Sequence, residues 1–146
     1  MNSVFHAGET ALQSAAGSRE RLAEVGPRVI REEMPEQHRA FFASLPFLVM
    51  ATTDPVGQPY VGMLTGSPGF VSAPDGRHLQ IAGRPAPDDP LDALLLPGAR
   101  FGLLGIEAHT RRRNRANGRV LARSADGLSL AVAQSFGNCP KYIQPR

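Results

Sequence analysis

Arginines are the densest source of chemistry in this sequence. Four of them lie within five positions, as Arg111, Arg112, Arg113 and Arg115, and six of the 16 basic residues fall between positions 111 and 123. A guanidinium group is always charged, and its forked donors match the oxygens of a phosphate. The cluster therefore predicts a phosphate-binding site. The alternative is a rim of solvated arginines at the end of a strand, which binds nothing.

Side-chain alternation decides which of these arginines can act together. In an extended segment Arg111, Arg113 and Arg115 share one face, and Arg112 and Asn114 lie on the other. The first face is suited to clamping a phosphate, and the second to pairing with acidic neighbours such as Glu107.

A fifth arginine, Arg84, ends another strand-like run just before a proline-rich loop. If the adjacent strand ends at the same rim, Arg84 joins the phosphate clamp. The alternative is an ordinary solvated strand end.

A second candidate region combines small and apolar residues in the middle of a predicted strand. It consists of Gly62, Met63, Leu64 and Thr65. A flat aromatic ligand can lie against such a backbone and accept hydrogen bonds from it. For Met63 and Leu64 the alternative is ordinary packing in the core, where such residues are commonly buried.

The elements that must position these residues change in character near residue 45. Before it, helices are expected at 10–16, at 19–25 (stopped by Gly26-Pro27) and from Pro35 onward. After it, strand-like runs alternate with turns, and one short helix is expected at 91–96. The long runs lie at 47–53, 60–65, 78–82, 101–106, 119–123 and 128–133, with a brief one at 70–72 and a turn expected at Gly118. This pattern predicts an α+β fold: a six-stranded antiparallel barrel (residues 45–146) with an N-terminal helical segment (residues 1–44) packed on it as a single structural domain.

Composition restricts the function classes. The chain is 42% hydrophobic and 20% charged with a net charge of +3, which is typical of a globular protein. It has no apolar run long enough for a membrane span and no signal sequence, so we expect a cytoplasmic protein without a membrane partner. Its single cysteine forms no internal disulfide, and its four histidines lack ligand spacing, so no metal site is predicted. Because nucleophile-elbow, P-loop and G-x-G-x-x-G motifs are all missing, no catalytic residue is assigned.

Several longer motifs run through nearly the whole chain. They are Phe5-His6-x-Gly8-Glu9, Met34-Pro35-Glu36-Gln37-His38, Leu45-Pro46-Phe47, Gly57-x-Pro59-Tyr60, Pro68-Gly69-Phe70, Ala82-x-Arg84-Pro85, Asp89-Pro90-Leu91, Leu103-Leu104-Gly105-Ile106-Glu107, Thr110-Arg111-Arg112-Arg113-Asn114-Arg115 and Gln134-Ser135-Phe136-Gly137-Asn138-Cys139-Pro140-Lys141-Tyr142-Ile143. With these motifs the chain resembles the pyridoxamine 5'-phosphate oxidase-related, FMN-binding split-barrel family, and within it a subgroup of predicted flavin-nucleotide-binding proteins.

The resemblance implies a homodimer with FMN in a groove between the subunits. Arg84 and the arginines at 111–115 would hold the phosphate, the backbone at 62–65 would face the isoalloxazine ring, and Asn138 and Lys141 would close the site. The pyridoxamine-substrate pattern of the oxidase itself is absent, so that activity is not expected. Relatives often continue beyond this chain, and some carry a ferredoxin-reductase-like extension. The resemblance therefore implies a detached or reduced form with a redox partner of that kind.

Three functions follow from these observations. The first is an FMN-dependent oxidoreductase that passes hydride or electrons through the flavin. The second is a non-catalytic module that carries flavin or assists a reductase. The third is a nucleic-acid binder that uses the arginine cluster. The third is disfavoured because no aromatic residue lies between Gly102 and Phe136 to stack on bases.

Overall fold

The computed structural model describes residues 4–138 of the 146-residue chain. The described residues divide into two compact units between residues 31 and 32. The first unit contains α1 (Ala7–Ala15) and α2 (Arg19–Val29). No helix within the described residues is long and apolar enough to span a membrane.

Helix α1 of the first unit begins at a capping box. The imidazole of His6 accepts hydrogen bonds from the backbone N–H groups of Gly8 and Glu9, and the Glu9 carboxylate accepts one from the His6 N–H. This reciprocal capping box gives the Phe5-His6-x-Gly8-Glu9 motif a structural role. The predicted stop at Gly26-Pro27 is wrong: α2 continues to Val29 with Pro27 inside the helix.

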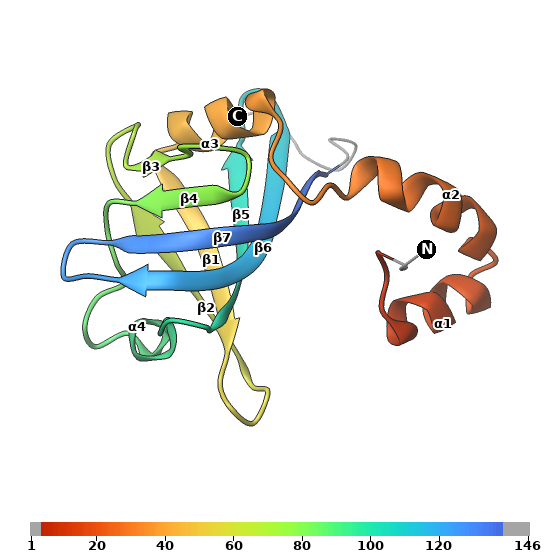
Figure 1. Ribbon diagram of the computed structural model, residues 1–146, viewed down its shortest axis with the longest axis horizontal. Coiled ribbons are helices and arrows are strands. Elements are labelled where there is room, and N and C mark those ends of the chain that lie inside the picture. The colour runs from red at the N-terminus through yellow and green to blue at the C-terminus, as the bar shows by residue number, and fades with distance from the viewer. Residues whose placement is uncertain (1–3, 139–146) are drawn as a thin grey trace. The chain divides into compact units, whose positions relative to one another are not determined.

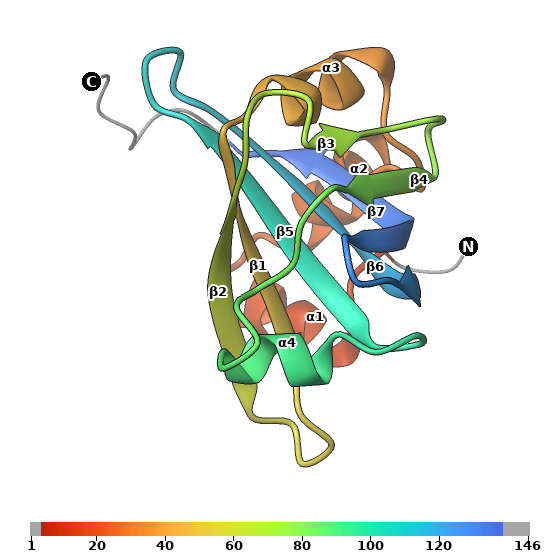
Figure 2. The same ribbon diagram turned by 90° about the vertical axis from the view of Figure 1, so that its left-hand side faces the viewer.

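The second unit is built on one curved antiparallel sheet, which Figures 1 and 2 show from two sides. Its seven strands lie in the order β2-β1-β5-β6-β7-β4-β3. Their bounds are β1 (Phe47–Thr53), β2 (Pro59–Thr65), β3 (Val71–Ser72), β4 (His78–Ile81), β5 (Arg100–Glu107), β6 (Arg112–Arg123) and β7 (Leu128–Gly137). The short α3 (Glu36–Ser44) and α4 (Pro90–Leu94) lie at opposite ends of the sheet in both views.

Strand count and strand length both differ from the prediction. Seven strands are present rather than six, because the two-residue β3 pairs with β4. The turn predicted at Gly118 is also wrong: β6 runs unbroken through it, and the turn before β6 spans residues 108–111. At Gly118 a Cβ atom would lie 1.8 Å from the carbonyl oxygen of Ala131. Glycine is therefore needed so that β7 can approach β6, beside a bulge between Asn117 and Gly118.

The core lies inside the curved sheet and beneath the two short helices. Phe41 and Phe42 of α3 are fully buried, with their rings edge to face at 5.7 Å. A hydrogen bond of 2.8 Å between His38 Nδ1 and Ser135 Oγ, both buried, joins α3 to β7. Helix α3 thus belongs to the second unit, which begins at residue 32.

Candidate functional site

The strand register brings the outward side chains of five strands onto one surface, here called the outer face. The residues form three rows across it, each listed from β2 toward β7. The first row consists of Met63, Val49, Leu104, Arg115 and Phe136. The second consists of Val61, Ala51, Gly102, Asn117 and Gln134, and the third of Thr65, Phe47, Ile106 and Arg113. In the first two rows the residues on β2, β1 and β5 are apolar, and polar residues follow on β6 or β7. In the third row Phe47 and Ile106 are apolar, between the polar Thr65 on β2 and Arg113 on β6.

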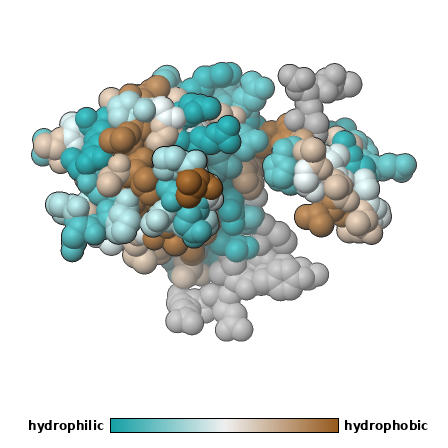
Figure 3. All heavy atoms as spheres, turned by 90° about the horizontal axis from the view of Figure 1, so that it is seen from below, coloured by the Kyte–Doolittle hydropathy of each residue, from teal (hydrophilic) through white to brown (hydrophobic). Residues whose placement is uncertain are grey.

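The apolar side of the outer face is unusually open to solvent. Val61 and Met63 on the edge strand β2 are 68% and 60% exposed. Figure 3 shows hydrophobic atoms in brown at the surface of the molecule, between larger hydrophilic areas in teal. Large apolar side chains exposed together mark a surface that contacts a ligand or a partner.

The polar side of the outer face is held by amide hydrogen bonds. Arg115 Nε donates to Asn138 Oδ1 at 3.0 Å, and Asn117 Nδ2 donates to Gln134 Oε1 at 3.2 Å. Between the two sides, Gly102 contributes no side chain. A shallow hollow of about 180 Å³ is found there, lined by residues that include Ala51, Leu104 and Arg115.

The structure places the predicted arginines in three different situations. Arg113 and Arg115 lie together on the outer face, as the alternation predicted. Arg112 points inward, with its guanidinium carbon 4.9 Å from the centre of the Phe41 ring, and so anchors β6 to α3. Arg111 lies in the turn before β6, with a left-handed backbone at φ 60°.

The remaining predicted residues also divide between the two faces. Met63 and Thr65 are exposed on the outer face, whereas Leu64 is buried in the core. Gly62 faces α4, and a Cβ atom there would lie 2.8 Å from a methyl carbon of Leu91. Asn138 meets the outer face through Arg115. Lys141 lies outside the described residues.

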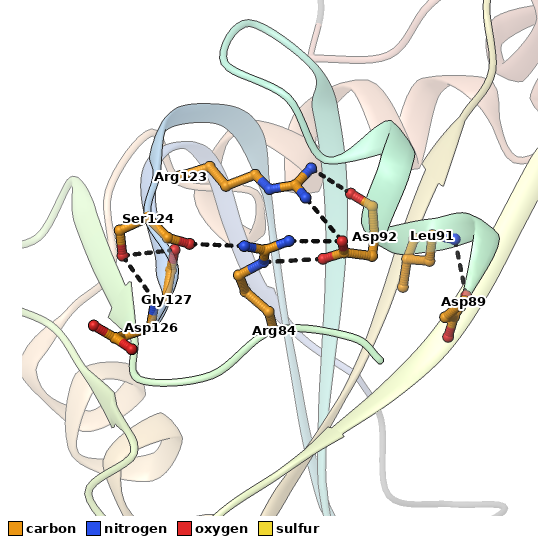
Figure 4. A network of polar contacts seen from close by, with 8 residues as sticks. All are labelled: Arg84, Asp89, Leu91, Asp92, Arg123, Ser124, Asp126 and Gly127. Carbon is orange, nitrogen blue, oxygen red and sulfur yellow. Dashed lines mark hydrogen bonds and ion pairs between the residues drawn. The ribbon is translucent and has the colours of Figure 1, made fainter. Parts of the chain in front are cut away.

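Arg84 belongs to a separate network, shown in Figure 4. Its guanidinium donates to both carboxylate oxygens of Asp92 on α4, Nε to Oδ1 at 3.0 Å and Nη2 to Oδ2 at 2.6 Å. Arg123 Nη2 also donates to Oδ2, at 2.8 Å, and Nη1 donates to the Asp92 backbone oxygen at 2.7 Å. Asp92 is only 5% exposed. The hydrogen bonds from Arg84 hold the pKa of the Asp92 carboxyl below its usual value, with the charge of Arg123 acting in the same direction.

This network lies at the far end of β6 from the predicted clamp. Arg84 Nη1 donates to the carbonyl oxygen of Ser124, next to Arg123 at the end of β6. Arg115 is eight residues earlier on the same strand, which at about 3.3 Å per residue is roughly 25 Å away. The structure therefore does not bring Arg84 together with Arg113 and Arg115.

Sequence reasoning missed the polar residues that continue the arginine row. Asn117 and Gln134 lie on the outer face beside Arg115, and alternation from Arg113 would have found Asn117. Asn117 was not identified because a turn was expected at Gly118, the next residue. Asn114 points inward, and its buried Nδ2 has no hydrogen-bond partner among residues 4–138.

No family model and no curated protein matches the chain. Solved structures do. A candidate pyridoxamine 5'-phosphate oxidase from Lactobacillus delbrueckii is 15% identical over 75% of this chain and 96% of its own, with a TM-score of 0.52. The tagged HupZ protein of Group A Streptococcus is 11% identical over 77% of this chain and 99% of its own, with a TM-score of 0.54. An FMN-binding protein from Syntrophomonas wolfei is 10% identical over 86% and 97%, with a TM-score of 0.49. The resemblance to pyridoxamine 5'-phosphate oxidase-like split-barrel proteins is thus confirmed at the level of the fold.

Proposed function

We propose that this protein binds a flavin nucleotide, FMN, on the outer face of its sheet. The observation that supports this most directly is the register, which sets an apolar surface beside two outward arginines on one face. The apolar side suits a flat ring system, and the arginines suit a phosphate.

The phosphate end of the proposed site consists of Arg113 and Arg115. Residues two apart on one strand face are about 7 Å apart, so two guanidinium groups can reach one phosphate. The bond from Arg115 Nε to Asn138 limits where the Nη groups point, and these groups form no hydrogen bond within residues 4–138. Each charge-assisted hydrogen bond to a phosphate would contribute about 1.5–3 kcal/mol.

The ring end consists of the apolar rows on β2, β1 and β5. A ring that covers Met63 would remove much of its 60% exposed surface from water, and full burial of such a side chain is worth about 1.5–3 kcal/mol. The amide pair of Asn117 and Gln134, at the border of this apolar area, offers the donors and acceptors that the polar edge of an isoalloxazine ring requires.

A bound flavin supplies the redox chemistry, which is transfer of hydride or electrons. The residues of this chain would bind the ring, orient it and exclude water. The outward side chains named above include neither a carboxylate nor an imidazole. This favours, as second candidate, a protein that carries flavin for a reductase without catalysing a reaction itself. Turnover of a nicotinamide donor by the loaded protein distinguishes the two functions.

We further propose that two copies pair through the apolar side of the outer face, so that FMN lies between them. Val61 and Met63 are on an edge strand and are the kind of exposed apolar pair that a partner buries. A Met63→Glu variant should remain folded, because its side chain is exposed, and should be monomeric by light scattering. A wild-type protein that is already monomeric at micromolar concentration would contradict this pairing.

The experiment for the proposed function is binding of FMN to the purified protein. The protein, as isolated or after addition of FMN and removal of the excess, should show a flavin absorption spectrum and release FMN on denaturation. Saturating FMN should also raise the melting temperature, because a ligand that binds only the folded state stabilises it. If FMN changes neither its own fluorescence nor the melting temperature, the proposal is wrong.

A further inference from the structure

Two arginines of the outer face are not explained by the flavin site. Arg100 on β5 and Arg119 on β6 are direct partners in the antiparallel ladder, and both are exposed. Side chains opposite each other on one face lie about 5 Å apart at their Cβ atoms, where like charges destabilise a sheet. Neither guanidinium forms an ion pair with an acidic residue in the described part of the chain. Two adjacent cations are thus left without internal compensation.

The two side chains are held differently. Arg119 Nη1 donates to the carbonyl oxygen of Gly98 at 2.9 Å, in a loop that is itself joined to β6 by hydrogen bonds between Gly98 and Val120 and between Val120 and Ala99. This bond fixes the direction of Arg119 and leaves its other N–H groups for a ligand. Arg100 makes no side-chain hydrogen bond within residues 4–138, so its donors are all available.

A hollow of about 320 Å³ lies at this pair. Arg100, Asn117, Arg119 and Gln134 contribute to its lining, together with the bulge residue Ala133 of β7. Such bulges re-aim side chains and are frequent beside binding sites. Here the bulge opens a concave surface next to two cations.

We propose that Arg100 and Arg119 form a second anion-binding site, which takes a phosphate or carboxylate group of a small molecule. The shared chemistry is an oxyanion that accepts hydrogen bonds from two forked guanidinium groups. Arg119 is four residues from Arg115 on β6, about 13 Å along the strand. The two anion sites therefore lie on either side of the Asn117–Gln134 amide pair. This second site does not depend on flavin binding, and it would be occupied beside a bound flavin by the anionic group of another ligand.

The test is a titration of the full chain with pyrophosphate and, separately, with citrate, in low-salt buffer by calorimetry. Arg100→Gln removes one cation without breaking any described hydrogen bond of its side chain. Arg119→Lys keeps the charge but removes the fork. The matched control is Arg21→Gln, an exposed arginine on α2. We expect Arg100→Gln to weaken anion binding at least about tenfold and the control to leave it unchanged. Pyrophosphate alone should bind if the site is specific for phosphate, and citrate alone if it is specific for carboxylate.

Thermal unfolding supplies a second readout. Without added anion, Arg100→Gln should melt at the wild-type temperature or above it, because it removes a like-charge pair. With pyrophosphate or citrate, whichever binds, the wild type should gain more stability than the variant. Equal stabilisation of both would overturn the site. A second result would also overturn the site: Arg100→Gln loses FMN binding while Arg115→Gln keeps it. The flavin phosphate would then bind Arg100 and Arg119, and these arginines would not form a separate site. Absence of FMN binding in every variant, with anion binding retained, would instead refute only the flavin proposal.

Discussion

The two ends of strand β6 present arginines in opposite situations. At its C-terminal end, Arg123 converges with Arg84 on the buried carboxylate of Asp92. At its N-terminal end, Arg113 and Arg115 point outward beside an apolar surface, and the one hydrogen bond described for the Arg115 side chain goes to the neutral amide of Asn138. The first end is electrically compensated inside the protein. At the second end, the exposed Arg115 forms no ion pair with an acidic residue within residues 4–138 and lies on a face with open hydrophobic residues.

The difference shows that arginine density is a poor guide to where a ligand binds. Arg84, in the loop after β4, and Arg115, on β6, are the same residue type, and the sequence analysis predicted them in one site. The two arginines differ because Arg84 donates hydrogen bonds to the carboxylate of Asp92. A buried carboxylate that accepts forked hydrogen bonds makes its arginines part of the fold, because removing either partner leaves a charge buried without compensation.

The largest expected effect comes from Asp92→Asn, which tests whether the C-terminal end is structural. Loss of the charge leaves Arg84 and Arg123 facing each other and should lower the free energy of unfolding by roughly 3–5 kcal/mol. Denaturant unfolding measures this. The control is Asp88→Asn, an exposed residue in the loop before α4, which should stay within about 0.5 kcal/mol of the wild type. FMN affinity of the folded variant should not change, and an Asp92 variant as stable as the control would remove the distinction between the two ends.

Acid pH should weaken the same end without any mutation. The pKa of Asp92 is held below its usual value in the folded protein, so the carboxyl of the unfolded chain takes up its proton first as the pH falls. The stability contributed by the network is therefore fully present above about pH 4 and is lost as the pH drops further through the lowered pKa. Unfolding measured from pH 7 to pH 2.5 should show this loss.

The control for the acid effect is Asp92→Asn, which should have a flatter acid limb. Asp75, whose pKa is lowered by its hydrogen bond to His78, would leave a residual slope. Parallel acid limbs in the wild type and in Asp92→Asn would show that Asp92 is not the titrating group.

The smallest expected effect concerns Arg111, in the turn that leads into the N-terminal end. Its left-handed backbone costs a non-glycine residue about 1 kcal/mol, which glycine avoids. Arg111→Gly should therefore raise the free energy of unfolding by up to about 1 kcal/mol. If Arg111 also contacts the phosphate, FMN affinity falls in the same variant, so a titration alongside the unfolding curve decides its role. A loss of stability would mean that the side chain supports the turn.

The sequence predicted the local features of the fold well. Alternation placed Arg113 and Arg115 on one face and Arg112 on the other, because side chains in a strand alternate whatever surrounds them. The short helix expected at 91–96 is present as α4 at Pro90–Leu94. These inferences depend on geometry within a single element.

The errors concern contacts between distant segments. Gly118 resembles a turn residue, and only the approach of the Ala131 carbonyl oxygen shows that it lies inside a strand. Likewise, Arg84 resembles a ligand-binding arginine in the sequence, and only its hydrogen bond to Asp92 on α4 shows that its guanidinium is bound within the fold. Outer-face residues such as Asn117 and Gln134 become neighbours only through the β6–β7 register. No local pattern contains that information.

The measurement that tests the central claim most directly is the ratio of the dissociation constants for riboflavin and FMN, which share a ring and differ in the phosphate. The wild type should bind FMN more tightly. Arg115→Gln should weaken FMN binding by roughly ten- to a hundredfold and leave riboflavin binding nearly unchanged. Arg84→Lys, at the compensated end, should keep the wild-type ratio. Equal affinities for the two ligands in the wild type, or a ratio altered by Arg84→Lys and not by Arg115→Gln, would contradict the account. So would tight, salt-sensitive binding of an oligonucleotide that Arg115→Gln abolishes.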